Sequence, residues 1–281
     1  QGGKGSNQAI ACGRAGVSTV FIGAMGQDAF AGQVRAFYRK ARIGCRLALK
    51  AGCATGTAMI LINQEGQNQI VIEPGANARL APADLPRRLL AHAKVLVTQL
   101  ESSLATTASV LRTARRAGVT TLLNPAPMRE DFDPRLLAHV DILVPNETEF
   151  AALVRQLPQL RRRNFHERDL RRMPGKALHA LCRKFDVPTV IITLGQRGCF
   201  ISGPASWQAI PAYAGMKVVD TTGAGDAFCG GLAAGLVRHA GDITSAARLG
   251  TAVAALSITK PGAANSMPSQ AEIGRFISAA V

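Results

Sequence analysis

The stretch "DTTGAGDAF", residues 220–228, predicts a glycine-containing turn that leads into a helix. Gly223 and Gly225 permit positive φ angles and leave room for a ligand close to the backbone. The free amide groups at a helix N-terminus bind anions, helped by the helix dipole, and phosphate is the obvious biological anion. Phosphoryl transfer also needs a base beside the phosphate. The stretch therefore predicts an anion hole formed by the amides of Gly223, Ala224 and Gly225, with Asp226 as the catalytic base.

A structural interpretation of the same stretch stays open. Helix N-termini favour short polar residues whatever their function, so Thr222 or Asp226 can serve as a simple helix cap. In that case the glycines serve only close packing.

The remainder of the chain alternates between strand-like and helix-like patterns. Helical patterns such as 103–118 and 176–185 separate most of the strand-like runs, and further helices are expected after Gly225. Strands that alternate with helices predict an α/β fold, here a doubly wound, mostly parallel sheet flanked by helices in one domain over residues 1–281. The apolar, β-branched runs are 17–26, 57–64, 69–75, 94–101, 120–127, 141–147, 189–195 and the strand expected immediately before Asp220.

The two runs within 57–74 break this alternation. They flank "NQEGQN", which predicts a β-hairpin with a glycine-containing loop, a candidate lid on the α/β domain.

Polar or glycine residues follow the expected strands at four places, namely Glu101, Asn146, Gly195 and Asp220. Ligands of open parallel sheets bind outside the carboxyl ends of the strands. We therefore expect these four positions to line one cleft.

A second glycine cluster, "GGKGSNQAIACGRAG", occupies residues 2–16. It is not a P-loop, because Gly5 follows Lys4 where that motif needs Ser or Thr. Lys4 and Asn7 lie at a turn leading into a helix, and both suit the hydroxyl groups of a polyol. A plain glycine-rich loop remains the alternative.

The net charge of +15 raises the question of a nucleic-acid partner. Much of the excess lies in the basic segment 155–176, which contains only Phe165 as an aromatic residue and matches no zinc-finger, RNA-recognition or homeodomain pattern. We interpret 155–176 as a solvated, mobile surface segment and do not expect a nucleic acid, although a polyanion-binding patch stays open.

Cysteine and apolar patterns point to a reducing cytoplasm. The six cysteines are scattered without a metal-ligand spacing, and no run reaches the roughly 18 apolar residues of a membrane span. We expect a cytoplasmic protein with no membrane partner.

Together and in this order, the two glycine clusters resemble the signatures of the ribokinase-like (phosphofructokinase B-type) carbohydrate kinases. The motifs "QLESS", "NPAP", "PNETE" and "ITLGQRG" between them resemble its ribokinase branch. The resemblance covers nearly the whole chain. It implies transfer of a phosphate from ATP to a sugar hydroxyl, with Mg²⁺ and a K⁺ activator, and D-ribose as the expected acceptor.

The resemblance also implies roles for individual positions. The sugar would be bound by Gly3, Lys4, Asn7, Glu101 and Asp226. The nucleotide, its phosphates and Mg²⁺ would be bound by Asn146, Glu149, Thr193, Gly195, Gly198 and Gly225. The monovalent cation would be bound by Asp220, Thr222, Ser257, Lys260, Gly262 and Ser266, several of them through backbone carbonyls.

The sequence departs from the family pattern at its beginning. It starts at Gln1 directly before the first signature, so the expected first strand, its sugar-binding aspartate and half of the lid lie outside it. A longer product and a degraded relative are both compatible with this start. The alternatives are another sugar or nucleoside kinase, and a non-catalytic nucleotide-binding remnant. A homodimer through the lid is a weaker expectation.

Overall fold

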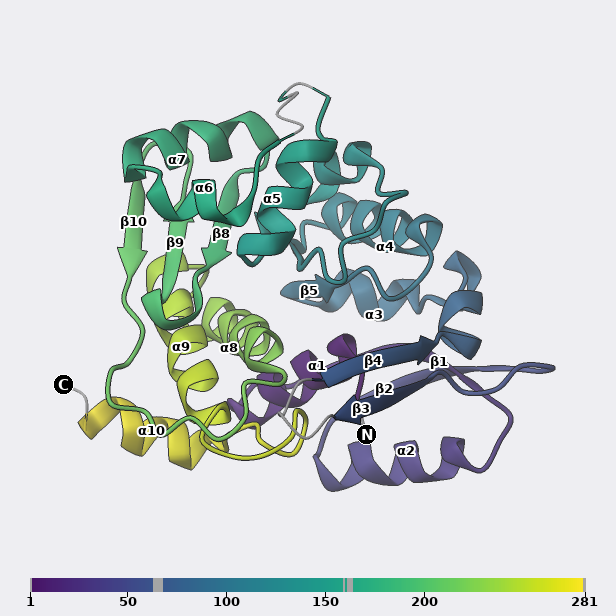
Figure 1. Cartoon of the computed structure of the whole chain (residues 1–281). Coiled ribbons are helices and arrows are strands. Elements are labelled where there is room, and N and C mark those ends of the chain that lie inside the picture. Colours follow the sequence, from purple (N-terminus) through teal and green to yellow (C-terminus); the bar gives the residue numbers. More distant parts are fainter. Residues whose placement is uncertain (1, 63–67, 159, 161–163, 280–281) are drawn as a thin grey trace.

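A six-stranded sheet forms the centre of the computed structural model, which describes residues 2–62, 68–158, 160 and 164–279 (Figure 1). β5 to β8 run parallel, whereas β9 pairs antiparallel with both β8 and β10. The doubly wound, mostly parallel α/β fold expected from the sequence is confirmed. In spatial order the strands are β10 (Trp207–Ile210), β9 (Cys199–Ser202), β8 (Thr189–Thr193), β7 (Ile142–Leu143), β6 (Thr120–Leu123) and β5 (Val95–Thr98).

Alternating side chains bury both faces of this sheet. Leu123 and Leu143 pack on one face against α4 (Leu104–Arg116), α5 (Glu147–Gln156) and α7 (Gly175–Cys182). Their chain neighbours Leu122 and Ile142 pack on the other face against α8 (Ala224–Arg238) and α9 (Ile243–Ser257). Successive residues of a strand point to opposite faces, so apolar runs without alternation are the pattern of a sheet covered on both sides.

Two smaller sheets lie below the main one in the view of Figure 1. β1 (Val20–Gly26) and β2 (Gly44–Lys50) form a parallel pair, with α2 (Phe30–Lys40) connecting them. β3 (Thr57–Ile62) and β4 (Asn68–Glu73) form the antiparallel hairpin predicted over 57–74. Residues 63–67 of its predicted loop lie outside the described part of the chain.

The first helix, α1 (Lys4–Arg14), packs closely against α8. A Cβ at Gly230 would lie 2.5 Å from the Cβ of Ala11, so only glycine allows this approach. The close packing brings the starts of both glycine clusters together. The other helices are the short α3 (Arg87–His92) and α6 (Glu167–Arg172), the C-terminal α10 (Gln270–Ala279) and 3-10 turns at 75–79, 82–84, 134–139, 183–185 and 195–197.

The prediction of a strand directly before Asp220 is wrong. The amides of Val219 and Asp220 both donate to the carbonyl oxygen of Ile258, at 2.8 and 3.2 Å, instead of forming a ladder. Val218 and Val219 are more than half exposed. β-branched residues favour strands only where neighbours cover them, and no cover exists here.

The basic segment 155–176 is not solvated throughout, contrary to the prediction from the sequence. It contains α6, and both Phe165 and Leu170 are buried in the core beside α5 and α7. Arg155 donates to the carbonyl oxygen of Phe165 at 2.7 Å. The described part of the segment therefore packs against the domain, while residues 159 and 161–163 lie outside the description.

None of the helices in the described ranges is long and apolar enough to cross a membrane.

Candidate active site

The site begins at the first turn of α8, where the sequence predicted an anion hole. Gly223 caps the helix in the left-handed conformation with φ of 78°, and its carbonyl oxygen accepts from Ala227 at 2.8 Å. The amide of Ala224 is not free, since it donates to the carbonyl oxygen of Thr221 at 3.1 Å. A Cβ at Gly225 would have no described heavy atom within 4 Å, so open space lies beside its backbone. The geometry of this first turn suits an anion. The amide of Ala224 could bind it only by leaving the carbonyl oxygen of Thr221 or by donating to both acceptors.

Asp226 lies within this first turn and is only 4% exposed. Its Oδ2 accepts from the Asn7 side-chain amide at 2.8 Å, and its Oδ1 accepts from the Gln8 amide at 2.9 Å. Burial raises the pKa of the Asp226 carboxyl, while these two hydrogen bonds and the charge of Lys4 lower it. The carboxylate is thus held from two sides, and it does not act as a helix cap through its side chain.

The sugar-side residues meet at the start of α1. Gly3 precedes the helix with φ of 91°, and the backbone amide of Lys4 donates to Glu101 Oε2 at 2.8 Å. Glu101 therefore binds the N-terminus of α1, and burial raises its pKa against the opposing effect of this hydrogen bond. Glu101 follows β5, as predicted from the strand-end pattern.

Asn7 carries the clearest sign of a missing partner. Its side chain is 6% exposed, and its Oδ1 is buried without a hydrogen-bond partner among the described residues. A buried acceptor of this kind costs free energy unless a ligand or water satisfies it. The arrangement suits a ligand hydroxyl that donates to Oδ1.

Asn146 and Glu149 form a capping box at the start of α5. The Asn146 backbone amide donates to Glu149 Oε2 at 2.9 Å, and the Glu149 amide donates to Asn146 Oδ1 at 2.8 Å. Burial raises the pKa of Glu149 to about 7, against the effects of the Asn146 amide and the charge of Lys4. This carboxyl group is therefore poised to change charge near neutral pH.

The predicted nucleotide residues follow β8. Thr193 forms an isolated bridge with Asn146, which places the ends of β7 and β8 side by side. Gly195 and Gly198 have φ of 55° and 81°. A Cβ at Gly198 would collide with the carbonyl oxygen of Ile210. The fold therefore requires glycine at this position whether or not a nucleotide binds.

Asp220 joins two of the other predicted cation residues, Thr222 and Gly262. Its Oδ1 accepts from the Thr222 amide and its Oδ2 from the Gly262 amide, both at 2.8 Å. This fixes the turn before Gly223 against the loop 258–268.

The other predicted cation residues make contacts of their own. Ser257 Oγ donates to Ala254 O, and Ser266 Oγ donates to Ala263 O, both at 2.8 Å. The Lys260 ammonium instead pairs with Glu272 at 2.5 Å. Within the described ranges, no group of three or more His, Cys, Asp or Glu residues could hold a metal ion.

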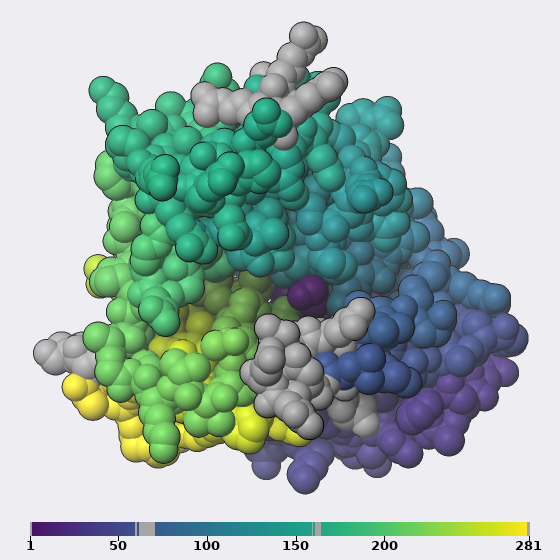
Figure 2. Space-filling view, viewed as in Figure 1, coloured from purple at the N-terminus to yellow at the C-terminus, as the bar shows by residue number. Residues whose placement is uncertain are grey.

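The structure thus gathers five of the predicted residues. The charge of Lys4 lowers the pKa of Glu101, Glu149 and Asp226, and Asn7 is hydrogen-bonded to Asp226. Figure 2 shows a recess on this side of the molecule, with the purple N-terminal part of the chain at its floor.

Sequence reasoning missed three side chains around Asp226, namely Gln8, Gln99 and Asn124. All three lie within stretches quoted in the sequence analysis, namely residues 2–16, "QLESS" and "NPAP". They come from three separate segments, so no local pattern shows that they meet beside Asp226.

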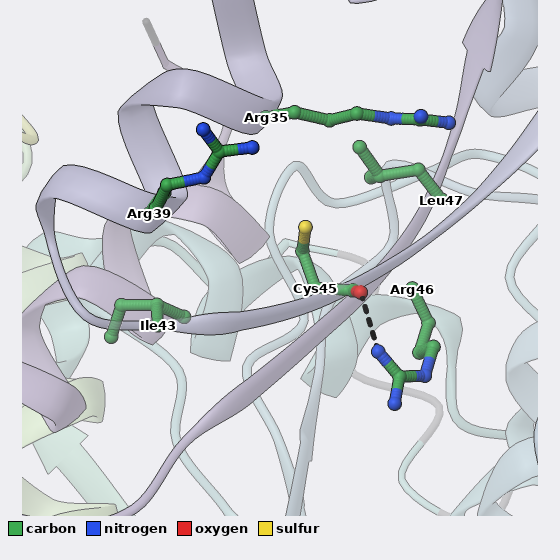
Figure 3. A pocket seen from close by; sticks show the side chains of 6 residues that line it. All are labelled: Arg35, Arg39, Ile43, Cys45, Arg46 and Leu47. Atoms are coloured by element: carbon green, nitrogen blue, oxygen red, sulfur yellow. Dashed lines mark hydrogen bonds between the residues drawn. The ribbon is translucent and has the colours of Figure 1, made fainter.

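A second hollow, of about 400 Å³, lies apart from these residues between α2 and β2 (Figure 3). Its lining contains none of the predicted site residues. It consists of Arg35, Arg39, Ile43, Cys45, Arg46 and Leu47. Figure 3 shows the Arg46 side chain turned away from the other two arginines, bonded to the carbonyl oxygen of Cys45 at 3.0 Å.

The family model "pfkB family carbohydrate kinase" matches residues 1–270. The chain belongs to this family. The family acts on alcohol groups, and this pfkB chain is accordingly a phosphotransferase with an alcohol group as acceptor, which confirms the resemblance of the two signatures.

Relatives of this pfkB chain include two ribokinases. The Staphylococcus aureus protein is 34% identical over 277 residues, which cover 98% of this chain and 87% of the relative. The Mus musculus protein is 36% identical over 273 residues, which cover 95% and 81%.

Solved structures show the same fold. The ribokinase of Giardia lamblia superposes with a TM-score of 0.88 at 30% identity and covers all of this chain and 89% of its own. The ribokinase of Arabidopsis thaliana, complexed with ribose and ATP, superposes with a TM-score of 0.83 at 26% identity over 98% and 87%.

Proposed function

We propose that this chain transfers the γ-phosphate of ATP to the 5-hydroxyl of D-ribose, giving ribose 5-phosphate and ADP. The observation that carries the proposal is the buried Asp226 at the first turn of α8, beside open space at Gly225 and in contact with Asn7. The ribokinases of Staphylococcus aureus and Mus musculus, and the Arabidopsis thaliana structure with ribose and ATP, support the substrates.

In this proposal Asp226 is the general base. Its carboxylate accepts the proton of the attacking hydroxyl, and the first-turn backbone of Gly223, Ala224 and Gly225 faces the transferred phosphate. Because the base and the anion hole share one helical turn, the hydroxyl and the phosphate would be held next to each other.

The sugar would be held by the groups at the start of α1. Asn7 Oδ1 would accept a sugar hydroxyl, which would satisfy this buried acceptor. Lys4 and the backbone of Gly3 would bind further hydroxyl groups. Glu101 would contact the sugar from its position at the N-terminus of α1. Its Oε2 already accepts from the Lys4 backbone amide there.

The nucleotide side would comprise Thr193, Gly195 and Gly198, with Asn146 and Glu149 organising Mg²⁺ and the phosphates. Oxygen ligands suit Mg²⁺. When bound, Mg²⁺ would neutralise charge on the phosphates. The Glu149 carboxyl, half-buried with a pKa of about 7, would be kept ionised by such a neighbour.

The turn at Asp220 would provide a monovalent cation site for K⁺. The proposed residues are Asp220, Thr222, Ser257, Lys260, Gly262 and Ser266. The Lys260 ammonium is paired with Glu272, so Lys260 would act through its backbone carbonyl.

Product analysis tests this function. The chain is incubated with Mg-ATP and each of several acceptors, namely D-ribose, 2-deoxy-D-ribose, D-fructose and adenosine, and the products are identified by ³¹P and ¹³C NMR. Phosphorylation at C5 of ribose is the expected result. Preference for another acceptor would identify another sugar or nucleoside kinase. ATP binding by calorimetry without any phosphorylated product would favour a non-catalytic nucleotide-binding remnant.

We also propose that two copies associate through the lid hairpin. Its face carries Met59, Leu61 and Val71, which are 64%, 49% and 54% exposed, and Met59 lies opposite Val71 in the ladder. An apolar sheet face of this kind is typically covered by a partner. Sedimentation velocity should show a dimer that Val71→Glu converts into a monomer. A wild-type chain that is monomeric at micromolar concentration would contradict this.

A further inference from the structure

The side chain of Gln8 is only 2% exposed, and every polar atom of its amide has a partner. Its Nε2 donates to Asp226 Oδ1 at 2.9 Å and to Asn124 Oδ1 at 3.1 Å. Its Oε1 accepts from Gln99 Nε2 at 2.5 Å. A buried amide with this complete a set of partners is fixed in position.

The orientation of this amide is also fixed, because the network ends in groups that can only accept. Asn124 Nδ2 donates to the carbonyl oxygen of Val144 at 2.9 Å, so Asn124 must present Oδ1 to Gln8. Gln8 must then present its NH₂ group to Asn124, and the second hydrogen of that group points to Asp226. Turning either amide over would place two acceptors together.

The network ties the carboxylate to the main sheet. Gln99, Asn124 and Val144 each follow the end of a parallel strand, β5, β6 and β7 respectively. Asn7 holds the other carboxylate oxygen, Oδ2, from the same helix as Gln8. With a donor on each oxygen, the carboxylate plane of Asp226 cannot rotate freely.

Beyond the roles assigned above, we propose that Gln8 is a positioning residue for the base. Gln99 and Asn124 orient its amide, and Gln8 in turn fixes the carboxylate plane of Asp226 and favours its ionised form. The inference rests on the proposed function only in calling Asp226 the base, since the network itself is independent of the substrate.

The surrounding charges show why a donor matters here. Lys4 favours the ionised carboxylate, whereas Glu101 and Glu149 face it from the end of β5 and from α5, and Cys229 lies one turn further along α8. Burial also favours the neutral acid. Neutral donors such as Gln8 offset these effects without adding charge.

The principal variant is Gln8→Met, which keeps the length of the side chain and removes both amide hydrogens. Because a donor to a carboxylate lowers its pKa, the loss should move the acid limb of kcat/KM for the sugar to higher pH by about one unit. On the plateau, kcat should fall about tenfold, with KM for ATP unchanged.

Ser6→Ala is the matched control, since Ser6 is buried in the same helix and accepts from Tyr38 Oη at 2.8 Å without touching Asp226. It should lower the melting temperature but leave the acid limb in place. Gln99→Met should shift the limb in the same direction as Gln8→Met, but less. It serves as the test if Gln8→Met does not fold.

A readout that needs no turnover separates this inference from the proposed function. Aspartate labelled with ¹³C at the carboxyl gives a titration curve for Asp226, assigned by its loss in Asp226→Asn. A higher midpoint in Gln8→Met than in the wild type and Ser6→Ala supports the inference even if ribose is not the substrate. Equal midpoints in all three proteins, or equal midpoints in Gln99→Met and the wild type where Gln8→Met does not fold, would overturn it.

Discussion

The side-chain amide of Asn7 donates to Asp226 Oδ2 at 2.8 Å across 219 positions of sequence. Together with the hydrogen bond from Gln8 to Asp226 Oδ1, this contact joins the two glycine clusters, at residues 2–16 and 220–228. The remaining oxygen of the Asn7 amide is buried and unpaired among the described residues. Asn7 therefore faces both the proposed base and the place where a sugar hydroxyl would lie.

Replacing Asn7 by alanine should raise KM for ribose about tenfold, the effect of losing one hydrogen bond of about 1.4 kcal/mol to the ligand. KM for ATP should stay unchanged, because no predicted nucleotide residue contacts Asn7. Steady-state kinetics with each substrate varied in turn measures both. Asn265→Ala, at an exposed asparagine, is the control and should match the wild type. An unchanged KM for ribose in Asn7→Ala would contradict the sugar-side assignment.

Gly225→Ala should lower kcat about 10²-fold while the melting temperature stays equal or rises. The added methyl group meets open space in the free protein and suits a helix, but it would stand where the phosphate has to approach. Thermal unfolding and turnover are measured on the same preparation. Wild-type turnover in this variant would mean that the phosphate does not approach Gly225.

Gly223→Ala is expected to lower the stability of the fold. Its φ of 78° is unfavourable for alanine, and the new Cβ would lie 3.0 Å from that of Ala263. Each kcal/mol lost should lower the melting temperature by roughly 2–4 °C. A stability equal to that of the wild type would show that the turn before α8 tolerates a side chain.

Glu149 should make stability depend on pH. Its folded pKa of about 7 lies above the ordinary value of 4.5, so between these values the folded chain holds a proton that the unfolded chain has released. The wild type should therefore lose stability relative to Glu149→Gln as pH rises from 5 to 7, and the difference should level off above 7. Urea unfolding at several pH values measures it. A difference that is constant with pH would show that Glu149 is ionised throughout.

Local chemistry explains why the start of α8 could be predicted from the sequence. The glycines of "DTTGAGDAF" permit a left-handed turn, and Gly223 adopts one directly before the helix. The strand ends at Glu101, Asn146 and Gly195 were predicted in the same way, because apolar runs end where the sheet does.

Contacts between distant segments explain what the sequence could not predict. The bond from Gln8 to Asp226 spans 218 positions and depends on how α1 packs against α8. The prediction of a strand before Asp220 was wrong because a strand also depends on contacts with distant segments. Val218 and Val219 have strand-forming side chains but no neighbouring strand to pair with. The hydrogen bond from Lys4 to Glu101 likewise gives Glu101 a contact with α1 that no motif indicates.

Ribose-dependent release of ADP by the wild type and by Asp226→Asn tests the central claim most directly. Both proteins are assayed with Mg-ATP, with and without D-ribose, in K⁺ and then in Na⁺ buffer, and their folding is compared by thermal unfolding. We expect turnover that requires ribose and is faster in K⁺, and that falls about 10²–10⁴-fold in Asp226→Asn because that change removes the base while keeping the shape. Equal turnover in the two proteins, or ADP release that does not depend on ribose, would contradict the account.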